Sequence, residues 1–132
     1  PEEFSTQDLI FSMNQEIFSV DNKLKFNGRI ENFDAFGDRT IFAKVIPNKK
    51  WNVLRDKTLD AVLKVAPDCT KKDKRPFQPH LTVANRDIPS GVSVRALEVM
   101  NELNLIEDFP VDNITIFERH ENKWCIAWSG EL

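Results

Sequence analysis

The order of apolar and polar residues changes period along the chain, and each change predicts a different element. Apolar residues recur at helical spacing from Leu9 to Ile17, after Ser5 and Asp8, whose spacing is close to that of a capping box. Phe4 is placed to staple this turn against Leu9. From Leu24 to Glu31 apolar and polar residues alternate, which is typical of a half-buried strand. The chain is therefore expected to open with a helix that is followed by a strand.

The remaining pattern predicts four more strands and two more helices. A turn at 34–38 leads into the next strand, and a turn at Glu121 and Asn122 joins the last two strands. The strands are expected at 39–46, 80–85, 112–119 and 123–130, and the helices at 51–66 and 93–103. Paired strands punctuated by helices indicate an α+β domain with largely antiparallel sheets. No repeat or linker divides the chain, so residues 1–132 are interpreted as one domain.

Composition excludes several classes of protein. The 132 residues are 41% hydrophobic, and no apolar run approaches the roughly 20 residues that span a bilayer. The net charge of −3 argues against a general polyanion-binding surface, although a few local donors can still hold a small phosphorylated ligand. Cys69 and Cys125 lie far apart with no CxxC partner, which favours reduced thiols in a cytoplasmic protein. The two histidines and two cysteines match no metal-ligand spacing, so we expect no metal and no cofactor.

The segment from Pro79 to Val83 carries the clearest chemistry. Alternate side chains of a strand share a face, so His80 and Thr82 should point one way and Leu81 and Val83 into the opposite, apolar layer. An imidazole can give or take a proton near neutral pH, and a Thr hydroxyl can donate to a phosphate oxygen. This pair suits phosphoryl chemistry without a metal. The alternative is that both residues simply occupy the wet face of a strand.

Other candidate residues lie close to this strand or at the end of the chain. The basic run that ends at Arg75 could reach an RNA backbone, or it could be solvated. Phe77 could stack on a base or fill the core. His120 is expected to be a solvated turn residue, and the tryptophans are expected to pack in the core or on strand faces. The basic run consists of Lys71, Lys72, Lys74 and Arg75. The tryptophans are Trp51, Trp124 and Trp128.

The pattern Phe77-x-Pro79-His80-x-Thr82, followed by an apolar residue and Ala84, resembles the second signature of the 2H phosphoesterases. It is most similar to that of the bacterial 2′-5′ RNA ligase family. The closing hairpin, the paired strands between 26 and 45 and the helix 51–66 also resemble that family, so the resemblance covers essentially all 132 residues. It implies a bilobal fold whose antiparallel sheets form a central groove, with helices outside.

The resemblance also implies an activity. Members open 2′,3′-cyclic phosphates or make and break 2′-5′ linkages in RNA, with two histidines as acid and base, two threonines on the phosphate, and no metal. Here His80 would be an acid/base and Thr82 a phosphate ligand. Phe77 and Arg75, whose chemistry is given above, are the candidate substrate-binding residues. The partners implied are RNA ends or small cyclic-phosphate nucleotides.

The sequence shows one His-x-Thr motif, whereas acid–base cleavage of a phosphodiester needs two proton-transfer groups. We expect the first motif to lie in an N-terminal segment before residue 1, and a complementing chain is an alternative source. Two other hypotheses stay open. One is a non-catalytic module that binds nucleotides or RNA ends, and the other is an inactive α+β domain.

Overall fold

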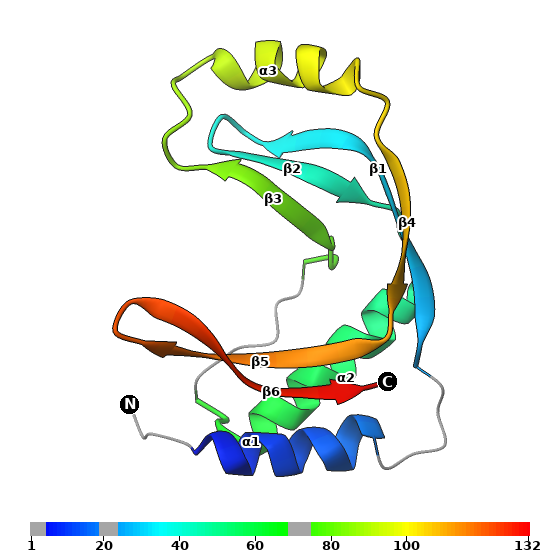
Figure 1. Ribbon diagram of the computed structural model, residues 1–132, viewed down its shortest axis with the longest axis vertical. Helices are drawn as coiled ribbons and strands as arrows, with labels where there is room; N and C mark the ends of the chain where they lie inside the picture. The colour runs from blue at the N-terminus through cyan, green and yellow to red at the C-terminus, as the bar shows by residue number, and fades with distance from the viewer. Residues whose placement is uncertain (1–4, 19–23, 69–74) are drawn as a thin grey trace. The chain divides into compact units, whose positions relative to one another are not determined.

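The computed structural model describes residues 5–18, 24–68 and 75–132. They belong to two compact units (Figure 1). The hairpin unit consists of Pro1–Phe26, Lys49–Arg75 and Val111–Leu132, and the sheet unit consists of Asn27–Asn48 and Pro76–Pro110. Each unit is described by itself below. Phe4, the predicted staple, lies outside the described residues.

The helices of the hairpin unit are α1 (Thr6–Met13), which continues as the π-helix η1 (Asn14–Phe18), and α2 (Lys49–Val65). The predicted cap of α1 is confirmed, because Ser5 Oγ accepts a hydrogen bond from the backbone N–H of Asp8 at 3.1 Å. Met13, Ile17 and Ala61 form the buried core of the unit. The apolar stripe that predicted the helix therefore also supplies the packing that holds α1 on α2.

The hairpin consists of β5 (Asn113–His120) and β6 (Lys123–Glu131), which pair antiparallel as the sequence predicts. Glu121 and Asn122 form its two-residue turn, and both adopt positive φ values, 45° and 66°. Ile114 and Ile116 point to the helices and pack against their buried core. The hairpin thus has one covered face, formed against α1 and α2.

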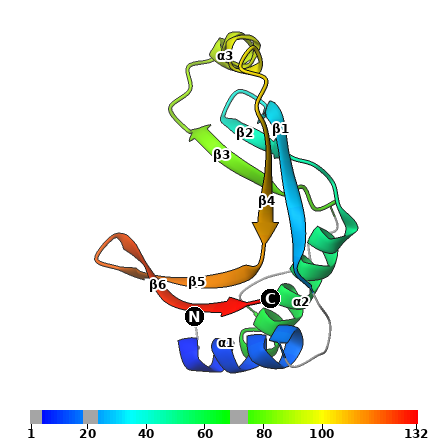
Figure 2. The same cartoon turned by 45° about the vertical axis from the view of Figure 1, so that its right-hand side comes forward.

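The sheet unit contains a four-stranded sheet in the order β3-β2-β1-β4. Its strands are β1 (Phe26–Phe36), β2 (Thr40–Val45), β3 (His80–Asn85) and β4 (Ile106–Val111), and its helix is α3 (Val92–Asn101). β2 pairs antiparallel with both β1 and β3. In two views α3 lies on one side of the sheet (Figures 1 and 2). The observed elements confirm the α+β class with antiparallel strands.

The core of the sheet unit lies along β2. Ile41, Phe42 and Ala43 are consecutive residues that are all buried, so β2 is covered on both of its faces. A strand in the interior of a sheet, with layers on both sides, is expected to be apolar throughout rather than strictly alternating. This explains why the pattern from Arg39 to Ile46 predicts a strand but does not reveal which face carries a site.

The sheet differs from the prediction at the end of β1 and in having the strand β4. The segment 34–36 was expected in a turn, but β1 continues to Phe36 and the turn lies at residues 37–39. β4 was not predicted, because its sequence combines two acidic residues with Pro110. An edge strand tolerates both features, since one of its backbone sides has no ladder to complete. At this edge Phe109 packs on Gly28, where an added Cβ would lie 2.6 Å from its ring.

Candidate active site on strand β3

Strand β3 spans His80–Asn85, as predicted, and forms one edge of the four-stranded sheet. Its register with β2 pairs His80 with Lys44 and Thr82 with Phe42. Directly paired residues of an antiparallel ladder project to the same face, and so do residues two apart on one strand. His80 and Thr82 therefore share one face of the sheet with Lys44, and both are exposed to solvent.

The imidazole of His80 has a defined orientation. Its Nδ1 lies 2.8 Å from the carbonyl oxygen of Gln78, which can only accept a hydrogen bond, so Nδ1 carries a hydrogen. The ring also meets Phe36 edge-on, with centroids 5.0 Å apart, and lies 5.3 Å from the ring of Phe42. With Nδ1 committed to the backbone, Nε2 is the nitrogen that can exchange a proton with a substrate or a water molecule.

The prediction that Leu81 and Val83 pack into an apolar layer is wrong. Each is 52% exposed. The physical reason is the edge position of β3, because α3 packs against the neighbouring strand β2 instead. The ladder is also irregular here, since the pairing shifts between Ile41 and Phe42 and leaves Val83 between two paired residues. All six residues of β3 are consequently exposed.

Lys44, Phe36 and Phe42 are neighbours of His80 that sequence reasoning missed. Lys44 alternates with Phe42 in the predicted strand, which indicates that the two share a face. The sequence does not say which strand pairs with that one, or in which register. The sequence therefore predicts which residues of a strand share a face, but it does not predict which strands pair.

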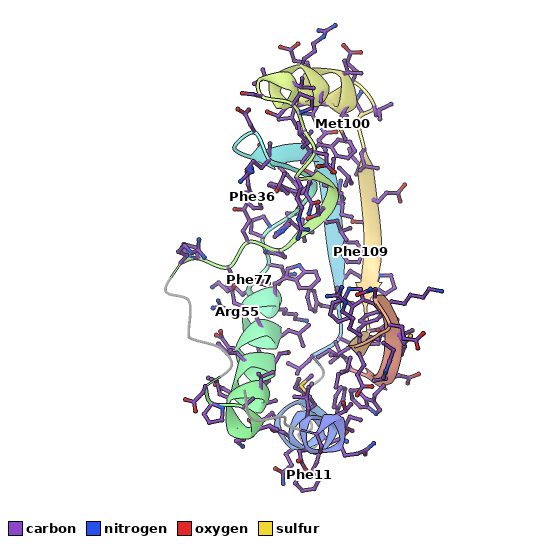
Figure 3. The ribbon with its side chains drawn as sticks, turned by 90° about the vertical axis from the view of Figure 1, so that its left-hand side faces the viewer. Phe11, Phe36, Arg55, Phe77, Met100 and Phe109 are labelled. Atoms are coloured by element: carbon purple, nitrogen blue, oxygen red, sulfur yellow. The ribbon has the colours of Figure 1, made fainter. Side chains whose placement is uncertain are left out.

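The two predicted substrate-binding residues fall in different units. Arg75 is exposed in the hairpin unit. Phe77, which is labelled in Figure 3, is exposed in the sheet unit, three residues before His80. The lysines of the basic run, 71, 72 and 74, lie outside the described residues. Binding of substrate by Arg75 and Phe77 stays a prediction.

The other histidine and the tryptophans occupy ordinary structural positions with one exception. His120 ends β5, and its Nε2 lies 3.0 Å from Glu118 Oε2 on the exposed hairpin, which agrees with a solvated residue. Trp51 packs edge-on against Phe26, and Trp128 packs against Phe18. Trp124, in contrast, is exposed on β6. The expectation of packing is thus wrong for this tryptophan.

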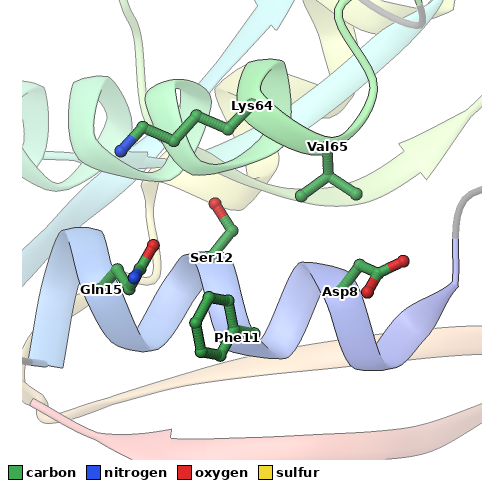
Figure 4. A pocket seen from close by; sticks show the side chains of 6 residues that line it. All are labelled: Asp8, Phe11, Ser12, Gln15, Lys64 and Val65. Atoms are coloured by element: carbon green, nitrogen blue, oxygen red, sulfur yellow. The ribbon is translucent and has the colours of Figure 1, made fainter.

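A hollow lies between α1 and α2 in the hairpin unit and has a volume of about 360 Å³ (Figure 4). Its lining residues are Asp8, Phe11, Ser12, Gln15, Lys64 and Val65. Two of its polar groups are already satisfied, because Lys64 forms an ion pair with Glu16 and Ser12 donates to the carbonyl of Ala61. These contacts indicate a structural role, so β3 is the better candidate for chemistry.

Within residues 5–18, 24–68 and 75–132, no three His, Cys, Asp or Glu side chains gather closely enough to hold a metal ion. None of the helices described combines the length and the hydropathy that crossing a bilayer requires.

Comparison with known proteins adds one finding. Residues 4–123 match the model of the 2′-5′ RNA ligase superfamily. The match includes β3 and its His-x-Thr motif and extends from the first helix to the closing hairpin. No curated protein matches the chain.

Proposed function

Because the chain belongs to the 2′-5′ RNA ligase superfamily, we propose that it is part of a 2H-type phosphoesterase. The proposed reaction is metal-independent cleavage of 2′,3′-cyclic phosphates or 2′-5′ phosphodiester linkages in RNA or small nucleotides. The observation that carries this proposal is the geometry of β3, where the His80 ring is anchored through Nδ1 and Thr82 lies on the same exposed face. Acid–base cleavage of a phosphodiester without a metal needs such a proton-transfer group beside a phosphate ligand.

In the proposed reaction, His80 performs one of two proton transfers. As the base, its Nε2 takes a proton from water, and the water oxygen attacks phosphorus. The bond between phosphorus and O3′ breaks, and O3′ takes a proton from a second group, which leaves a 2′-phosphate. Thr82 donates its hydroxyl hydrogen to a non-bridging phosphate oxygen throughout.

The second proton-transfer group belongs, in this proposal, to another His-x-Thr strand outside these 132 residues. An N-terminal segment or a complementing chain would supply it. The expected substrates are RNA ends and small nucleotides, in keeping with the net charge of −3. We assign the protein to the cytoplasm, because the exposed free thiol of Cys125 fits a reducing compartment.

The test is hydrolysis of adenosine 2′,3′-cyclic phosphate by the full-length protein, followed by chromatography of the product. His80→Ala should lower kcat by roughly 10²- to 10⁴-fold, the usual contribution of a general acid or base. Thr82→Val, which removes the hydroxyl at similar volume, should lower kcat/KM roughly tenfold. His120→Ala is the matched control, because that histidine lies on the exposed hairpin.

Three outcomes would contradict the proposal in different ways. Wild-type hydrolysis by His80→Ala would remove β3 from the chemistry altogether. Binding of the nucleotide that depends on Thr82, without any turnover by the unmodified protein, would favour a non-catalytic module for nucleotides or RNA ends. Substitutions that change neither binding nor turnover would indicate an inactive α+β domain.

A further inference from the structure

In the sheet unit, Lys44 is the positively charged residue that pairs directly with the His-x-Thr motif. It stands directly opposite His80 in the ladder of β2 and β3. Side chains of such cross-strand pairs have Cβ atoms about 4.5–5.5 Å apart, and they emerge on the same face. The Lys44 side chain is half-buried, unlike the fully exposed strand that it faces. Its aliphatic stem thus lies against the sheet at the edge of the proposed site.

The carboxylates on this face are engaged elsewhere. The pairing of β1 with β2 shifts between Ile30 and Phe33, so Glu31 and Asn32 both stand across from Lys44. Glu31 accepts a hydrogen bond from Arg29 Nε at 2.8 Å. Asp34, which is opposite Phe42, accepts one from the N–H of Ala35 at 2.8 Å. These acidic groups therefore already have donors.

Across the described parts of the chain, Lys44 forms no ion pair. The ion pairs of the sheet unit join Arg29 to Glu31 and Asp108, and Arg95 to Glu98. The ammonium at the end of this half-buried side chain therefore has no counter-charge among the described residues. An anion on the His80 face would supply that counter-charge, at a distance that a four-carbon side chain can adjust to.

We propose that Lys44 is a phosphate ligand of this site, in addition to Thr82, and that it stabilises the charge of the reacting phosphoryl group. The proposal rests on the proposed function. A cyclic phosphodiester carries one negative charge, and further negative charge builds up on its non-bridging oxygens as water attacks. Lys44 should therefore bind the transition state more strongly than the substrate, so its removal should lower kcat more than it raises KM.

The kinetic test compares three variants of the full-length protein on adenosine 2′,3′-cyclic phosphate. Lys44→Met removes the charge and keeps most of the stem, and it should lower kcat roughly 10- to 100-fold. Lys44→Arg keeps the charge and should recover most of that loss. Lys49→Met removes the same charge from the exposed first residue of α2 and should behave as wild type.

A second measurement needs neither turnover nor a variant. Acetylation of lysines by acetic anhydride is followed by mass spectrometry, with and without adenosine 2′-phosphate. The nucleotide should slow acetylation of Lys44 at least severalfold and leave Lys49 unchanged. This readout also decides the question if Lys44→Met does not fold.

The outcomes separate this proposal from the proposed function. If His80→Ala is inactive while Lys44→Met keeps the wild-type kcat, or the nucleotide does not protect Lys44, the role of Lys44 is refuted and the phosphoesterase remains. If His80→Ala keeps full activity, the proposed function itself fails. Loss of kcat in Lys44→Met with recovery in Lys44→Arg, together with protection, supports the assignment.

Discussion

Replacement of Phe42 by alanine should destabilise the protein by about 3–5 kcal/mol, the usual cost of deleting a buried Phe side chain. Phe42 is 1% exposed and lies on the interior strand β2. Its ring stacks on Phe36 with centroids 4.3 Å apart and also lies near the ring of His80. The substitution therefore removes packing in the core of the sheet unit and support for the candidate catalytic histidine at the same time.

The magnitude follows from burial. Transfer of a Phe side chain out of water is worth about 1.5–3 kcal/mol, and the cavity left in a rigid core adds a comparable cost. Phe36 has the same ring and the same stacking partner but is 41% exposed. Its substitution by alanine should cost only about 1–2 kcal/mol, because it loses less buried area and leaves an open site. The two phenylalanines thus form a matched pair that differs in burial.

The assay is urea unfolding of the full-length protein, followed by circular dichroism and tryptophan fluorescence. Phe42→Leu provides a milder variant in case Phe42→Ala does not fold, since the total stability of a domain is only about 5–15 kcal/mol. Equal losses for Phe42→Ala and Phe36→Ala would refute the reasoning, because they would mean that burial on β2 does not set the cost.

Three further predictions concern local contacts and use the same unfolding measurement. Gly28→Ala should cost about 1–3 kcal/mol, because the new Cβ would meet the Phe109 ring 2.6 Å away; an unchanged unfolding midpoint would mean that the ring moves freely. Ser5→Ala should lower the free energy of unfolding by about 1 kcal/mol, because it removes the N-cap of α1, whereas Ser5→Asp should keep the cap and the stability. Ser12→Ala should cost about 1 kcal/mol, since the buried hydroxyl donates to the Ala61 carbonyl at 2.8 Å, and a gain in stability would contradict this role.

Local features of the chain were predictable from the sequence because their causes lie within a few residues. The Ser5 cap depends on the spacing of two neighbouring side chains, and the strand from His80 to Asn85 depends on alternation after a proline. The common face of His80 and Thr82 follows from the two-residue period of any strand. The interpretation of residues 1–132 as one domain stays a prediction.

Features that depend on partners distant in sequence were predicted incorrectly or not at all. The exposure of Leu81 and Val83 is set by the edge position of β3, and β4 exists because β1 offers it a ladder. The place of β3 or β4 in the sheet cannot be predicted from the residues of that strand alone, since strand order is decided by contacts between segments tens of residues apart.

The same distinction between local and distant contacts applies to the candidate site. The sequence by itself determined the residue types and spacing of the His-x-Thr motif, and with them the class of chemistry. Only the tertiary structure decided that Lys44 stands opposite His80 and that the rings of Phe36 and Phe42 lie beside its imidazole. The physical reason is that strand pairing joins residues 36 positions apart, and a sequence specifies its pairing only through the packing of the whole sheet.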